Sequence, residues 1–146
     1  MLLKNLIKNT PQIPEKLIKA VVAHSGGWED FQESAPDIAR NDIMGGFHGW
    51  IYHKDTCSFF QKNRDLILEY SHSLSKELGE DMLTMIQNFG CLKDAELNQH
   101  ELALALYTGK GDDDVVVQVE NAMAWFAAEE VAQAYYRIIE EGGNND

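Results

Sequence analysis

The sequence of 146 residues contains two cysteines and three prolines, and it has no long apolar run. Cys57 and Cys91 have no CxxC partner, which argues against a zinc knuckle and a disulfide framework and favours buried free thiols. A membrane span needs about 20 consecutive apolar residues, so none is expected. Because Met1, Leu2, Leu3 and Lys4 do not begin a secretory signal, we expect a cytoplasmic protein.

Basic residues are also scarce: 12 Lys and Arg stand against 24 Asp and Glu, a formal net charge of −12. From position 94 to the end, Lys110 and Arg137 are the only basic residues among twelve acidic ones. Binding to nucleic acid needs a basic surface that neutralises phosphates, so direct nucleic-acid binding is not expected. The charge favours either a protein partner with a basic surface or a purely solubilising role.

Several catalytic and metal-binding motifs are missing, among them HExxH, the GxSxG elbow and the GK[ST] ending of a P-loop. The tightest group of metal-ligand types is His48, His53 and Asp55, but its spacing is nonspecific and Lys54 lies within it. We therefore expect no metal, no cofactor and no catalytic residue. A small hydrolase or metal-dependent enzyme that uses the 47–55 loop stays an alternative.

The apolar residues recur at spacings of three and four, which is typical of amphipathic helices. Composition is that of a globular domain, with 45% hydrophobic and 25% charged residues. The prediction is an all-α fold, or α with a minor hairpin, built as an irregular bundle of five to seven helices. Helical patterns cover residues 2–7, 14–25, 28–34, 36–41 after a break at Pro36, 55–78, 81–88, a segment capped by Asp94 that ends at Gly109, and 112–140.

One segment does not fit a helix, because Gly45, Gly46 and Gly49 alternate with aromatic residues. We predict a glycine-rich aromatic loop or short hairpin at 44–53. Its backbone N–H groups could cradle an anion, but packing of the aromatic rings on the helices is the preferred interpretation. Residues 1–141 are predicted to form one helical domain, and the polar end at 142–146 is predicted to be disordered.

The final predicted helix concentrates acidic residues. Three aspartates open it, where carboxylates interact favourably with the helix dipole. At about 100° per residue, Glu120, Glu130 and Glu141 fall within about 80° of one another and form a carboxylate strip. An aromatic anchor such as Trp50 would add affinity. The predicted partner-binding residues are Asp112, Asp113, Asp114, Glu120, Glu130, Glu141 and Trp50.

Three stretches, 26–28, 45–56 and 125–131, resemble a family of uncharacterised phage and prophage proteins of this length, over residues 15–140. In size and acidity the chain is also similar to phage inhibitors of host defence. The resemblance implies a viral setting. The leading hypothesis is a phage-encoded, non-enzymatic binding protein that inhibits a host protein with a basic surface, such as a defence or nucleic-acid-binding protein. A homo-oligomeric structural or accessory phage protein is a further alternative.

Overall fold

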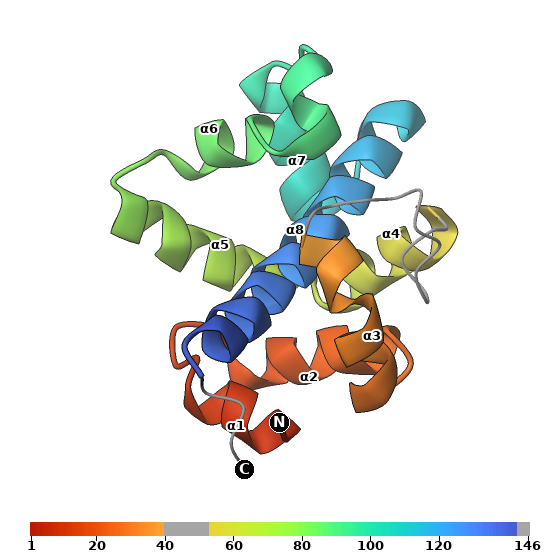
Figure 1. Ribbon diagram of the computed structural model, residues 1–146. Helices are drawn as coiled ribbons and strands as arrows, with labels where there is room; N and C mark the ends of the chain where they lie inside the picture. Colours follow the sequence, from red (N-terminus) through yellow and green to blue (C-terminus); the bar gives the residue numbers. More distant parts are fainter. Residues whose placement is uncertain (40–52, 143–146) are drawn as a thin grey trace. The chain divides into compact units, whose positions relative to one another are not determined.

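The computed structural model describes residues 1–39 and 53–142, of which 79% are helical (Figure 1). These residues form eight α-helices and a 3₁₀-helix without any strand, so the all-α prediction is confirmed. The loop predicted at 44–53, including Trp50, lies outside the described residues, except that His53 begins helix α4. Of the predicted tail, Gly142 lies in a turn after the last helix, and residues 143–146 are outside the described part.

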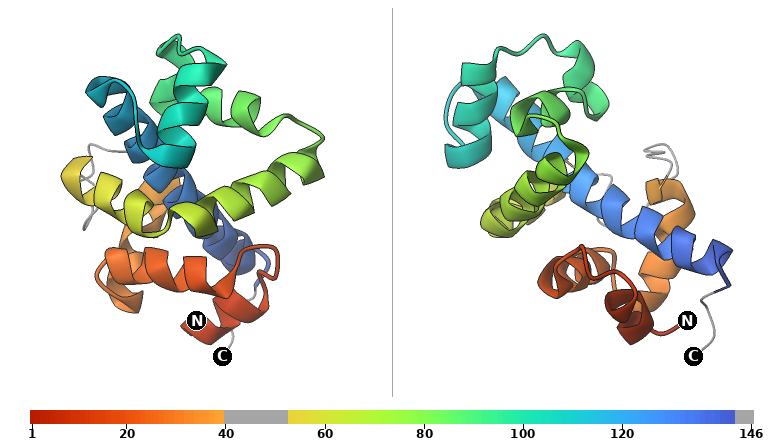
Figure 2. Two further views of the ribbon diagram at one scale, coloured as in Figure 1. Left: turned by 180° about the vertical axis from the view of Figure 1, so that it is seen from behind. Right: turned by 90° about the vertical axis from the view of Figure 1, so that its left-hand side faces the viewer.

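The described residues divide into two compact units that share the longest helix, α8 (Asp113–Glu140). Unit 1 consists of the described residues within Met1–Tyr52 and Ala127–Asp146, and unit 2 is His53–Phe126. The first half of α8 therefore belongs to unit 2 and the second half to unit 1, and Figure 2 shows α8 as one continuous ribbon. The single domain predicted for residues 1–141 stays a prediction.

Unit 1 begins with α1 (Leu3–Lys8), α2 (Glu15–His24) and α3 (Trp28–Ala39). Pro14, predicted as the first residue of this helix, is instead its N-cap, with φ −55°, and α2 begins at Glu15. Leu17 and Val21 bury one face of α2, which packs against α3. The chain turns between these helices at Gly26 and Gly27, whose φ angles of 106° and 118° favour glycine.

The predicted break at Pro36 is wrong, because α3 continues through it to Ala39. A proline inside a helix removes one backbone hydrogen bond and costs about 3 kcal/mol. Phe31, Ala35 and Ile38, at positions i, i+4 and i+7, are completely buried. Burying this one face offsets the cost of the proline.

Aromatic contacts join α3 to the second half of α8 within unit 1. The Tyr135 ring meets the rings of Trp28 and Phe31 edge to face, with centroids 5.7 and 5.6 Å apart. Gln32 Nε2 donates a hydrogen bond to the Tyr135 hydroxyl at 3.2 Å. These contacts fix the position of α3 on this part of α8.

Unit 2 contains α4 (His53–Lys62) and α5 (Arg64–Leu78), where one long helix over 55–78 was predicted. The helix breaks at Asn63, which has φ −116° and ψ 19°. The Asn63 side chain donates a hydrogen bond to the Phe59 carbonyl at 2.9 Å, a local bond that competes with helical structure. The apolar spacing continues across the break, so periodicity alone could not reveal it.

The next elements are α6 (Met82–Gln87), a 3₁₀-helix η2 (Gly90–Asp94) and α7 (Gln99–Thr108). Asp94 was predicted to cap the helix that became α7, but it ends η2 instead. The cap of α7 is Asn98, which forms a capping box with Glu101. This reciprocal pair satisfies two backbone donors, which one aspartate four residues earlier cannot reach.

Helix α8 is enclosed along its middle. All ten residues from Val119 to Ala128 are buried, most of them alanine or apolar residues. The apolar residues that recur at helical spacing along α8 are buried, except for the half-buried Val116: Val119, Met123, Phe126, Val131, Ala134, Tyr135 and Ile138. A helix without a solvated face has no room for an unpaired charge, so Glu120 requires a partner.

Candidate functional site

The sequence predicted that Glu120 belongs to a solvated carboxylate strip. This prediction is wrong, because only 2% of the surface of Glu120 is exposed. It lies at the start of the enclosed part of α8. The charge-free, alanine-rich run that follows it, residues 121–128, is the signal in the sequence that could have indicated burial on every side.

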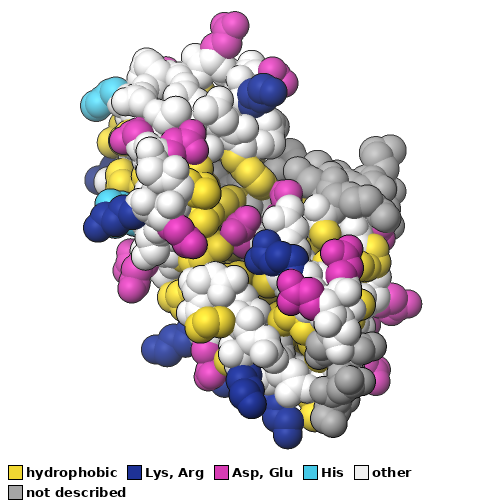
Figure 3. All heavy atoms as spheres, turned by 60° about the vertical axis from the view of Figure 1, so that its left-hand side comes forward, with side chains coloured by type: hydrophobic (Ala, Val, Ile, Leu, Met, Phe, Trp, Pro, Cys, Tyr) yellow, Lys and Arg dark blue, Asp and Glu magenta, His cyan; other side chains and the backbone are white. Residues whose placement is uncertain are grey.

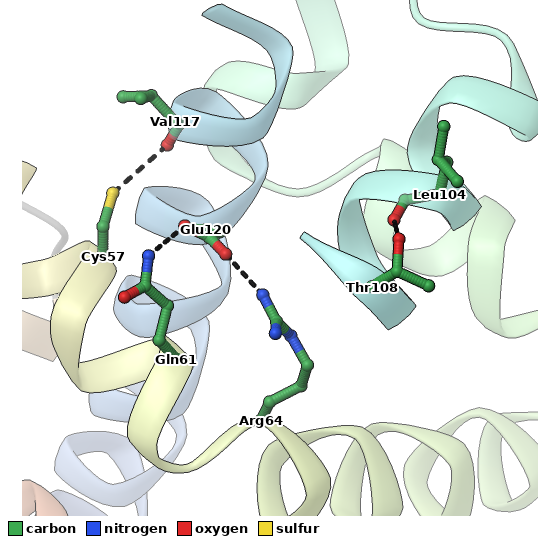
Figure 4. A network of polar contacts seen from close by, with 7 residues as sticks. All are labelled: Cys57, Gln61, Arg64, Leu104, Thr108, Val117 and Glu120. Carbon is green, nitrogen blue, oxygen red and sulfur yellow. Dashed lines mark hydrogen bonds and ion pairs between the residues drawn. The ribbon is translucent and has the colours of Figure 1, made fainter. Parts of the chain in front are cut away.

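The Glu120 carboxylate is held by two side chains of unit 2 (Figure 4). Arg64 Nη2, at the start of α5, lies 2.5 Å from Oε2, and Gln61 Nε2, near the end of α4, donates to Oε1 at 2.8 Å. The Arg64 guanidinium also lies 5.2 Å from the centre of the Phe60 ring. The break at Asn63 separates the two helices that supply these donors. Both carboxylate oxygens are thus occupied, which identifies the group as a structural anchor.

Cys57 lies beside this anchor and points its thiol toward the Val117 carbonyl, with 3.6 Å between Sγ and O. Burial, and then the negative charge of Glu120, raise the pKa of the Cys57 thiol above its ordinary value. A thiol that stays protonated is a weak nucleophile. The predicted buried free thiol is confirmed at Cys57, and its surroundings do not favour covalent catalysis.

Three exposed carboxylates of unit 2 lie at the turn between α7 and α8. Asp112, Asp113 and Asp114 are all exposed, as predicted. Asp112 Oδ1 accepts from the backbone N–H of Asp114 at 3.0 Å and of Val115 at 3.4 Å, so it caps α8. We call residues 107–117 the acidic turn.

The other predicted binding residues do not join the acidic turn within one unit. Glu130 is half-buried and Glu141 is exposed, and both belong to unit 1. On the face drawn in Figure 3, Asp and Glu side chains lie among Lys and Arg side chains instead of forming one continuous patch. The acidic turn is therefore the part of the predicted binding set in which three exposed carboxylates lie together in one unit.

Glu129, which the paired glutamates of the sequence indicated to lie on a solvated helix face, is half-buried in unit 1. Its Oε1 accepts a hydrogen bond from Gln133 Nε2 at 3.0 Å. Burial, and then the charge of Glu130, raise the pKa of Glu129 from 4.5 to about 7. The two consecutive glutamates can be seen in the sequence, but how far each of them is buried cannot.

Other kinds of site receive no support from the described residues. Among residues 1–39 and 53–142, no three His, Cys, Asp or Glu side chains lie close enough to hold a metal ion. The alternative metal group includes His48, which is outside that part, and its third member, Asp55, is exposed. Within the same residues no helix is long and apolar enough to cross a membrane.

A family model described as a domain of unknown function, DUF7222, matches residues 13–141. The chain belongs to the DUF7222 family. The match includes all of residues 15–140, for which the sequence predicted a phage or prophage family, and the family description does not mention a phage origin. No curated protein and no solved structure matches the chain significantly.

The buried pair of this DUF7222 domain can be tested by Glu120→Gln, which keeps the side-chain size but leaves Arg64 without a counter-charge. Breaking a buried pair costs about 3–5 kcal/mol, and since 21% of the Arg64 side chain is exposed we expect about 3 kcal/mol. Urea unfolding at pH 7 gives this loss. The double variant Arg64→Met with Glu120→Met should recover most of it, whereas the exposed control Glu77→Gln should cost under about 0.5 kcal/mol. Equal losses for Glu120→Gln and Glu77→Gln would refute the anchor.

Two glycines allow a matched test of packing against the pair. Gly79 and Gly109 end α5 and α7 with the same φ of 68°. A Cβ at Gly79 would meet nothing within 4 Å, but at Gly109 it would lie 2.8 Å from Arg64 Nη2 and 3.4 Å from Glu120 Oε2. We expect Gly79→Ala to cost about 1 kcal/mol from backbone strain alone. Gly109→Ala should lower the free energy of unfolding by at least about 1 kcal/mol more than Gly79→Ala does in the same experiment. Equal losses would show that Arg64 and Glu120 move aside for the new methyl group without loss of stability.

The raised pKa of Glu129 predicts a pH-dependent stability. The folded state holds this proton more tightly than the unfolded state, so its contribution is complete below about pH 4.5 and is lost as the pH rises through about 7. Glu129→Gln should therefore match the parent near pH 4.5 and be more stable at pH 8.5, by about 1 kcal/mol after allowance for solvent screening. Thermal unfolding across this range provides the measurement. The exposed control Glu33→Gln should show no such divergence, and a parallel shift of both variants would contradict the assignment.

Proposed function

We propose that this chain is a phage-encoded, non-enzymatic binding protein that inhibits a host protein by covering its basic surface with the acidic turn. The observation that carries the proposal is the exposure of the acidic turn. The acidic turn combines three exposed carboxylates with two exposed apolar side chains, Tyr107 (52% exposed) and Val117 (40%). Carboxylates beside exposed apolar groups suit a protein interface, because charge directs association and apolar anchors supply affinity.

The carboxylates of the acidic turn are available to a partner. Asp112 uses one oxygen to cap α8, and within the described residues neither Asp113 nor Asp114 forms an ion pair. Unit 2 holds thirteen acidic and six basic residues, so the field around the turn is negative. A basic partner would be attracted at a rate that falls as salt screens the charges.

Two arguments support an inhibitory role in a phage setting. The sequence resembles phage and prophage proteins, and small acidic phage proteins include inhibitors of host defence. A host surface that binds nucleic acid is basic, so an acidic partner that occupies it would block that binding. The alternatives of an enzyme or a homo-oligomer have no comparable observation behind them in the described residues.

A paired substitution tests the acidic turn. Asp113→Asn with Asp114→Asn removes two exposed charges but leaves the Asp112 cap in place. With the partner captured from a bacterial lysate by the tagged parent at low salt, we expect the association rate to fall about 3- to 10-fold and its salt dependence to flatten. Stopped-flow or biosensor measurements over a range of ionic strength give both quantities.

The matched control is Glu77→Gln with Glu80→Gln, two exposed acidic residues near the end of α5 in the same unit. It changes the net charge equally and should alter the association rate less than about 2-fold. Equal slowing by both pairs would assign the effect to net charge alone. An unchanged rate in the Asp113 and Asp114 variant, or no basic protein captured by the parent, would overturn the proposal.

A further inference from the structure

A hollow of about 300 Å³ opens on the surface of unit 1. Two residues of α3, Pro36 and Ala39, line one side, and two residues of α8, Tyr136 and Glu140, line the other. The hollow lies between helices that are joined by the Tyr135 contacts with α3. Its walls are therefore held by packing within a single unit.

The lining combines an aromatic residue, small apolar groups and one carboxylate. Tyr136 and Glu140 are four residues apart on α8 and so lie on the same helix face. The neighbouring Tyr135 ring packs edge to face on Tyr136, with centroids 5.8 Å apart. A ring beside a carboxylate attracts a cation, while proline and alanine favour the alkyl part of a ligand.

Arg137 is the one basic residue of α8 near this face, and acidic residues on α3 and α8 outnumber it. On α3, the exposed Glu33 lies three residues before Pro36 and so on the same side of that helix. On α8, Glu129 and Gln133 precede Tyr136 by seven and three residues, which continues the face along the helix. Burial and the charge of Glu130 raise the pKa of Glu129, and a nearby cation would favour its ionised form.

We propose that this hollow binds an arginine side chain of the basic partner, with the guanidinium against Tyr136 and Glu140 and the alkyl stem against Pro36 and Ala39. The inference rests on the proposed function and names the chemistry of one contact. Arginine is favoured over lysine because its planar guanidinium can stack on an aromatic ring while it donates two hydrogen bonds to one carboxylate.

The test titrates the full chain with three blocked tripeptides, Gly-Arg-Gly, Gly-Lys-Gly and Gly-citrulline-Gly, and follows backbone NMR shifts. Citrulline has the shape of arginine without its charge. We expect the arginine peptide to shift the Ala39 and Tyr136 resonances and to bind at least about 5-fold more tightly than the other two. Equal binding of the citrulline or lysine peptide would overturn the proposal, as would no shift at Ala39 and Tyr136.

Variants locate the contact. Glu140→Gln and Tyr136→Leu should each weaken arginine binding about 3- to 10-fold, whereas Tyr136→Phe, which keeps the ring, should bind as the parent does. The control Glu29→Gln removes another exposed charge of unit 1 and should change binding less than about 2-fold. Retained binding in Glu140→Gln would refute the site. Because these variants lie in unit 1 and those at Asp113 and Asp114 lie in unit 2, a failure of this inference can be distinguished from a failure of the proposed function.

Discussion

The enclosure of α8 constrains the rest of this structure. From Val119 to Ala128 the helix has no solvated face, and small side chains allow other segments to approach it closely. Glu120 is the one ionisable residue in that stretch. Its burial would cost several kcal/mol without a counter-charge, so the fold must bring Arg64 to it.

Two local departures from regular helix lie beside the Arg64–Glu120 ion pair and allow it to form. The break at Asn63 ends α4 after Gln61 has reached Glu120 and starts α5 at Arg64. At Gly109 the chain leaves α7 where a side chain would strike the Arg64 guanidinium, so the glycine supplies both a left-handed turn and the necessary space. The two features lie far apart in the sequence but adjoin the same two side chains.

The acidity of the chain is divided among carboxylates in different physical states. Glu120 is neutralised inside unit 2, and Glu129 is half-buried with a raised pKa in unit 1. Only exposed carboxylates such as Asp113 and Asp114 can attract a partner over a distance in water. The net charge of −12 alone therefore does not show which carboxylates can attract a partner, because that depends on whether each one is exposed or buried.

Local patterns determined most of the helices. The proline before α2, the glycine after α5, the aspartates at the start of α8 and the apolar spacing along α8 each act within a few residues, so they can be read from the sequence. The same local signals misplaced the cap of α7 and divided α3 at Pro36, because the burial of Phe31 and Ile38 outweighed the proline. Which carboxylates face water was decided only in three dimensions. A helical wheel places Glu120 by angle, but its exposure depends on Gln61 and Arg64, more than fifty residues earlier in the chain.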